Sequence, residues 1–171
     1  MDKKLYLLAE LDNDTQAKIK EFEEIISKNG LIGKQTKEIP YHITLCSFPV
    51  EDENRLIHLL EKKGEELSEI NITFSGLGLF GLDVLFLNPY MNKELINIYL
   101  SLNKNSDNEN DDLAAHVTLL IDEPENIIKI LPKIAKKFQR ITGKLKYLSL
   151  YEFFPARIIR RIELKRALPS K

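Results

Sequence analysis

The segment Tyr41-His42-Ile43-Thr44-Leu45 has a near-copy at Ala115-His116-Val117-Thr118-Leu119. The chain contains three histidines, and two of them stand in the same pattern: an apolar or aromatic residue, His, a β-branched apolar residue, Thr and Leu. Composition alone gives a histidine such neighbours roughly one time in fifty, so two of three by chance is on the order of one in a thousand. The copies lie too far apart for a short tandem repeat and predict two half-domains.

Both segments are rich in β-branched and apolar residues and are predicted to be β-strands. Residues two apart on a strand point to the same face, so His42 projects together with Thr44, and His116 together with Thr118. The intervening apolar residues point the other way, toward a buried layer. Two such strands that face a common cleft would supply two imidazoles and two hydroxyls.

This set of groups suits the cleavage of a phosphodiester without a metal ion. Histidine titrates near neutrality, so one ring can act as base while the other, protonated, acts as acid. The threonine hydroxyls can donate hydrogen bonds to the non-bridging phosphate oxygens. Two alternatives remain open: a purely structural role for each histidine, and a zinc site in which Cys46 joins the two imidazoles on the same strand face.

With these motifs the chain resembles the 2H phosphoesterase superfamily, and within it the 2′-5′ RNA ligase and RNA 2′,3′-cyclic phosphodiesterase group. The resemblance includes an opening strand at Leu5–Leu11, the first motif at Pro40–Leu45, and a hairpin at 74–80 and 84–87. It implies an α+β, bilobal fold in a single domain over 1–171, with two pseudo-symmetric lobes of antiparallel sheet and outer helices around a central cleft.

The resemblance also implies roles for the motif residues: His42 and His116 as base and acid, and Thr44 and Thr118 as donors to the phosphate. In the RNA ligase group an arginine often follows each motif threonine by three residues. Here those positions hold Ser47 and Ile121.

Length and composition describe an ordinary globular protein. The 171 residues suffice for one compact domain with a sizeable core, and 43% hydrophobic with 30% charged residues is typical of a soluble chain. A net charge of −1 argues against tight non-specific binding of long nucleic acid. The single cysteine precludes an internal disulfide. With no signal peptide or membrane-length apolar run, we expect a cytoplasmic monomer without membrane contact.

Hydrophobic periodicity and turn residues predict the order of the elements. We expect strands at 4–11, 41–48, 71–80, 83–88, 115–121, 144–153 and 157–165. Helices are expected at 14–28, 52–68, 92–103 and 124–139, the first of them ended by Asn29-Gly30. The acidic segment 107–112 is expected to be a surface connection, with a lid over the cleft as an alternative.

Further substrate-binding candidates lie around the two motifs. The basic candidates are Lys37, Arg157, Arg160 and Arg161; because Arg160 and Arg161 are adjacent, only one of these two would face the cleft in a regular strand. The aromatic candidates for stacking on a base are Phe80 and Tyr151, with Phe154 beside them. His58 lies on a predicted helix and is expected to have no role in the site.

We therefore expect a metal-independent phosphodiesterase without a cofactor. Its substrate would be a 2′,3′-cyclic phosphate, at an RNA end or on a small cyclic nucleotide. The weak net charge and the two missing arginines favour a small substrate over a long RNA. A slow or non-catalytic nucleotide-binding module and a true 2′-5′ RNA ligase remain the alternatives. The sequence does not assign base and acid between the two histidines.

Overall fold

The computed structural model describes residues 3–103 and 113–167, which form seven strands and four α-helices. The strands are β1 (Lys4–Leu11), β2 (His42–Pro49), β3 (Ile70–Phe80), β4 (Val84–Pro89), β5 (Val117–Ile121), β6 (Ile141–Phe153) and β7 (Arg157–Glu163). The helices are α1 (Asn13–Lys28), α2 (Glu53–Glu66), α3 (Lys93–Asn103) and α4 (Pro124–Lys137), and a 3₁₀ turn, η1 (Val50–Asp52), precedes α2.

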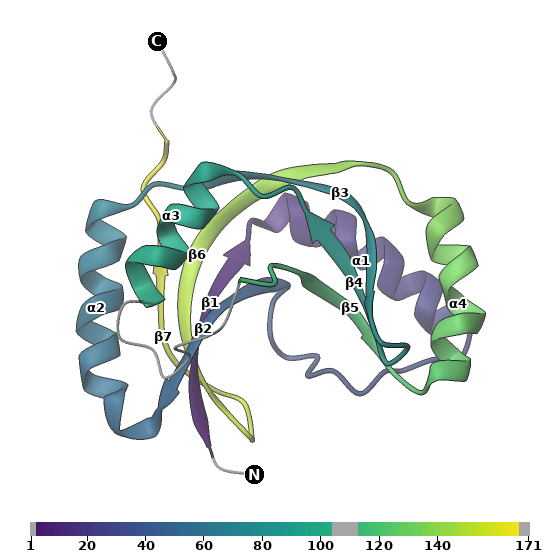
Figure 1. Cartoon of the computed structure of the whole chain (residues 1–171), viewed down its shortest axis with the longest axis horizontal. Helices are drawn as coiled ribbons and strands as arrows, with labels where there is room; N and C mark the ends of the chain where they lie inside the picture. The colour runs from purple at the N-terminus through teal and green to yellow at the C-terminus, as the bar shows by residue number, and fades with distance from the viewer. Residues whose placement is uncertain (1–2, 104–112, 168–171) are drawn as a thin grey trace.

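The strands form one antiparallel sheet in the order β2-β1-β6-β3-β4-β5. The long strand β6 joins its two halves: residues Ile141–Leu145 pair with β3, whereas 147–152 pair with β7, and β1 runs along the other edge. Figure 1 shows the sheet strongly curved, with α2 and α3 flanking one half and α1 and α4 the other. The predicted α+β fold with an antiparallel sheet and outer helices is confirmed.

All four helices pack their apolar faces into the same hydrophobic core. On β1 the residues Leu5, Leu7, Ala9 and Leu11 face this core, as strand alternation requires. The opposite, concave face therefore receives the side chains between them, among them Glu10. This face carries the candidate site.

Helix α1 shows how local sequence sets the element ends. The Asp12 side chain accepts a hydrogen bond from the Thr15 backbone N–H (2.8 Å), which caps the first turn. At the other end Asn29 closes the helix and Gly30 follows with φ 76°, a left-handed conformation that glycine adopts without strain. The helix predicted over 14–28 and its Asn-Gly end are thus confirmed.

The observed element ends differ from the predicted ones by at most three residues; β6, for example, begins at Ile141 instead of 144, and α4 ends at Lys137 instead of 139. The chain makes the 3₁₀ turn η1 before α2, so the helix predicted at 52–68 covers Glu53–Glu66. Strand β5 begins at Val117 instead of 115, because the pairing of β4 with β5 ends at Leu87 and Val117. His116 therefore lies just before the strand. The last strand ends at Glu163 instead of 165. The predicted acidic connection 107–112 lies outside the described residues.

Candidate functional site

The two motifs come together because the curved sheet brings its end strands, β2 and β5, into contact. His42 and Thr118, one from each motif, line the same pocket, and the two histidines are close enough to interact electrostatically. Thr44 follows His42 on the concave face, because the β1–β2 register is regular from His42 to Thr44. The two motifs therefore come close together, with His42 and Thr118 in the lining of the pocket, whereas Thr44 and His116 are not among its lining residues.

Both imidazoles are held in the same way. The Nδ1 atom of His42 donates a hydrogen bond to the carbonyl oxygen of Pro40 (2.7 Å), and Nδ1 of His116 donates to the carbonyl oxygen of Ala114 (2.7 Å). A carbonyl oxygen only accepts, so each Nδ1 carries a proton. In the neutral tautomer this leaves Nε2 of each ring as the atom free to take up or deliver a proton.

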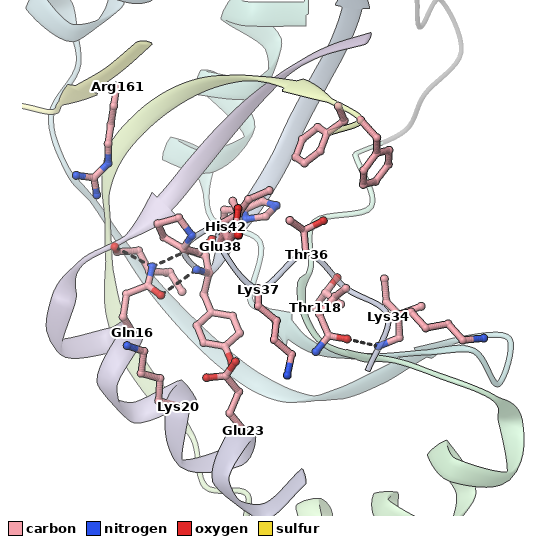
Figure 2. A pocket seen from close by; sticks show the side chains of 18 of the residues that line it. Gln16, Lys20, Glu23, Lys34, Thr36, Lys37, Glu38, His42, Thr118 and Arg161 are labelled. Carbon is pink, nitrogen blue, oxygen red and sulfur yellow. Dashed lines mark hydrogen bonds between the residues drawn. The ribbon is translucent and has the colours of Figure 1, made fainter. Parts of the chain in front are cut away.

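Two glutamines fix the backbone around the motifs, a function that sequence reasoning missed. Gln16 on α1 binds both backbone groups of Tyr41: its Nε2 donates to the carbonyl oxygen and its Oε1 accepts from the N–H, each at 2.8 Å (Figure 2). Gln35 binds β5 in the same manner, donating to the Leu119 carbonyl (3.3 Å) and accepting from Ile121 N–H (3.1 Å). Nothing in the local sequence marks either glutamine.

The pocket has a volume of about 530 Å³, within the range of small-ligand sites. Its walls come from α1, from the segment 34–41, from β5 and from the turn after β6. Figure 2 shows His42, Thr118, Lys37 and Thr36 among the side chains around it. The predicted contact residue Lys37 thus lines the pocket, whereas Lys34 is engaged in an ion pair with Glu123.

Aromatic rings surround His116. Phe80 meets its imidazole edge-on, with ring centroids 4.8 Å apart, and Phe86 lies 5.3 Å away. Phe80 is 41% exposed, as a residue available to a base should be. Tyr151 is instead buried and stacks on Phe153, so it offers no free ring face.

The predicted arginines need correction. Arg157 is bound to Glu152 (2.5 Å) and to Glu53 (2.7 Å), and it does not line the pocket. Arg160 pairs with Glu61 of α2 (2.8 Å), on the side of the sheet away from the pocket.

The register of β6 and β7 explains this arrangement. Arg160 lies opposite Leu150, which faces the core. Arg161 lies opposite Ser149. Both Ser149 and Thr44 pair with Leu8 of β1, so Ser149 lies on the same concave face as Thr44. Arg161 lines the pocket and Arg160 does not, so Arg161 is the one of the two adjacent arginines that remains a candidate.

Cys46 also differs from expectation. Leu8 pairs with Thr44 while Leu7 pairs with Cys46, so Leu45 is an extra residue in β2, a bulge that changes the face on which the next side chain lies. Cys46 consequently packs in the hydrophobic core, and burial raises the pKa of its thiol to about 12. It cannot join the imidazoles around a metal ion, and no cluster of three potential ligands occurs among the described residues.

Glu10 is a further site residue that the sequence analysis did not single out. Its carboxylate is fully buried beside His42, its partner in the β1–β2 register, and accepts a hydrogen bond from Arg161 Nε (2.7 Å). Burial lowers the pKa of His42 below its ordinary value; the bond to Pro40 and the charge of Glu10 oppose this shift, and the nearby His116 adds to it. An acidic residue inside an apolar strand was the available signal.

His58 lies on α2, which contributes no residue to the pocket, as expected. Among the described residues no helix has the length and apolar character needed to cross a membrane.

No family model and no curated protein matches the sequence, but solved structures share its fold. A phosphoesterase structure aligns with a TM-score of 0.62 at 18% identity, covering 96% of this chain and 99% of the other. LigT of E. coli aligns with a TM-score of 0.60 at 16% identity, covering 97% and 100%. The protein TT0787 of Thermus thermophilus aligns with a TM-score of 0.67 at 13% identity, covering 96% and 100%. The chain therefore has the fold of the LigT-like 2H phosphoesterases.

Proposed function

We propose that this protein is a metal-independent phosphodiesterase that hydrolyses a 2′,3′-cyclic phosphate, at an RNA end or on a cyclic nucleotide. The observation that carries the proposal is the matched pair of Nδ1 hydrogen bonds, which leaves the Nε2 atoms of His42 and His116 for chemistry. A purely structural role for His42 would not require a second histidine, in the other motif, that is held by the same kind of hydrogen bond.

The comparisons support the proposal at the level of fold and ligand class. Two of the similar structures are a phosphoesterase and LigT, and LigT has been solved with 3′-AMP, with ATP and with NADP⁺. A pocket of about 530 Å³ is large enough for a nucleotide.

The surroundings of the two histidines favour one division of roles. Because the pKa of His42 is lowered, its imidazole is neutral at pH 7 and suited to act as base. His42 Nε2 would take a proton from the attacking water, whose oxygen bonds to phosphorus as one ribose oxygen leaves. His116 would deliver a proton from Nε2 to that leaving oxygen. The hydroxyls of Thr44 and Thr118 would donate to the non-bridging oxygens, where the negative charge is greatest.

A panel of nucleoside 2′,3′-cyclic phosphates and cyclic-ended oligonucleotides, assayed in excess chelator, tests the proposal. We expect the wild-type protein to form product and both His42→Ala and His116→Ala to abolish it. His58→Ala, which replaces the remaining histidine of the chain, on α2, should leave product formation intact. Saturable nucleotide binding without product from any member of the panel would instead identify a binding module. A requirement for stoichiometric zinc would also contradict the mechanism.

A further inference from the structure

We infer that Arg161 is a fixed anion-binding fork for a second phosphate of the substrate, separate from the phosphate held between His42 and His116. This inference rests on the proposed function and narrows its substrate class. It points to a nucleotide that carries a phosphate on its 5′ oxygen, as a cyclic-ended oligonucleotide does, in preference to a bare nucleoside cyclic phosphate.

Two contacts immobilise the Arg161 guanidinium group. Its Nε donates to the buried Glu10 carboxylate (2.7 Å), and its central carbon lies 3.7 Å from the centroid of the Tyr147 ring. The first contact fixes one edge of the planar group, and the second places one of its faces on an aromatic ring. The side chain is therefore held in one orientation before any ligand arrives.

The remaining edge of the guanidinium group is available to a ligand. Within the described part of the chain, the only hydrogen bond of Arg161 is the one that its Nε makes to Glu10. The N–H donors of its two terminal NH₂ groups are therefore unused by the described residues. The side chain is 39% exposed and lines the pocket. Figure 2 shows Arg161 as an extended side chain among the residues that line the pocket. A planar pair of donors fits two oxygens of one phosphate.

The position of the fork separates it from the reacting phosphate. His42, Glu10 and Tyr147 lie opposite one another on β2, β1 and β6, three successive strands. Neighbouring strands are about 4.8 Å apart, so the β6 strand of Tyr147 lies roughly 10 Å from the β2 strand of His42. The Glu10 carboxylate, on the strand between them, binds Arg161 and places the fork to one side of the phosphate that His42 would hold.

The other cations of the pocket are less suited to this role. Lys34 is already paired with Glu123. Lys20 and Lys37 are long, flexible point charges, and Glu23 and Glu38 line the same wall. Arg161 alone among these four combines a buried counter-charge with a fixed plane and unused donors.

A pair of substrates that differ only in the second phosphate tests the inference. The pair consists of one nucleoside 2′,3′-cyclic phosphate and the same compound with a 5′-phosphate. A cyclic-ended dinucleotide serves as a third substrate, because its internal phosphate is attached to the 5′ oxygen of the cyclic-ended nucleotide. We expect the wild-type protein to have a higher kcat/KM for the two substrates with the second phosphate. Arg161→Gln should reduce kcat/KM for these two about 10- to 100-fold and for the bare nucleotide less than about 3-fold.

Matched variants separate the fork from general effects of charge and folding. Arg160→Gln removes the adjacent arginine on the opposite face and should leave kcat/KM unchanged for the substrates with and without the second phosphate. Arg161→Lys keeps a positive charge beside Glu10 without the fork and should lose most of the preference. The double variant Glu10→Gln/Arg161→Gln avoids an unpaired buried carboxylate and should show the same selective loss, with thermal unfolding recorded for every variant.

Equal turnover of both nucleotides by the wild-type protein would overturn the inference while leaving the proposed function in place. So would an equal loss on both substrates in Arg161→Gln, which would assign the arginine to the reacting phosphate or to folding. If no cyclic substrate is turned over, the proposed function fails. Calorimetric measurement of the binding of the two nucleotides then tests whether Arg161 binds a second phosphate. If it does, the 5′-phosphorylated nucleotide should bind more tightly, and this difference should disappear in Arg161→Gln.

Discussion

Replacing Gly78 by alanine should damage the site through one aromatic ring. A Cβ atom at Gly78 would lie 2.3 Å from Cε2 and 2.4 Å from Cζ of Phe86, its partner on the neighbouring strand β4. Carbon atoms in contact are ordinarily about 3.5 to 4.0 Å apart, so the Phe86 ring must retreat by more than about 1 Å. That ring is buried and contacts both Phe80 (centroids 4.4 Å apart) and His116 (5.3 Å apart), so its retreat should displace at least one of them.

The magnitude follows from the displacement. Overpacking of a buried ring costs about 1–3 kcal/mol of unfolding free energy. A misplacement of about 1 Å in a reacting group costs on the order of 100-fold in rate. We therefore expect Gly78→Ala to unfold at modestly lower denaturant concentration and to lose about 10- to 100-fold in kcat/KM for a cyclic phosphate.

The same strand offers a matched control. A Cβ atom at Gly76 would meet nothing within 4 Å, so Gly76→Ala should retain activity and stability. The double variant Gly78→Ala/Phe86→Leu should regain part of the lost activity, because the smaller side chain makes room. The histidine NMR resonances provide a readout that does not depend on activity: only those of His116 should shift strongly. Wild-type kcat/KM together with unshifted His116 resonances in Gly78→Ala would refute the reasoning.

Three further predictions concern the quartet and its surroundings. His42→Ala and His116→Ala should each remove most turnover, and the double variant should be little worse, because the two rings act as one unit; additive losses would contradict this. Thr44→Val or Thr118→Val should reduce kcat about 10- to 1,000-fold with unfolding unchanged, as measured on a cyclic phosphate. Because Glu10 raises the pKa of His42, Glu10→Gln should lower it further and move the acidic limb of the pH–rate profile to lower pH. NMR titration of His42 should show the same direction, and a shift to higher pH would exclude this coupling.

The sequence predicts the fold well because its signals are local. Strand and helix periodicity, the Asp12 cap and the Asn29-Gly30 end all act within a few residues, and they give the right order of elements. The repeated motif adds one non-local prediction, that two segments far apart in the sequence lie close together, and β2 and β5 are in contact. The comparisons confirm the resulting fold even at 13–18% identity.

Two of the errors in the site, those at Cys46 and Arg160, arise from strand register. A single extra residue at Leu45 moves Cys46 from the concave face to the core. The choice between Arg160 and Arg161 depends on which of them lies opposite Ser149, a pairing between residues on two different strands. The alternation of apolar and polar residues along one strand reveals neither a bulge nor the register of pairing with its neighbour. Both can be seen only in the assembled sheet.

The motif is symmetric, but the neighbours of its two histidines are not, and this asymmetry bears on how the pair would work. His42 lies beside the buried Glu10 carboxylate, whereas His116 contacts the rings of Phe80 and Phe86. Two groups with the same chemistry take different protonation roles when their surroundings differ, since the surroundings decide which charge state is stabilised. In the reverse, bond-forming direction the same rings would exchange their roles, because each step must retrace the other. In the proposed mechanism the residues that flank the motifs, and not the motifs themselves, would therefore set which histidine begins the reaction as base.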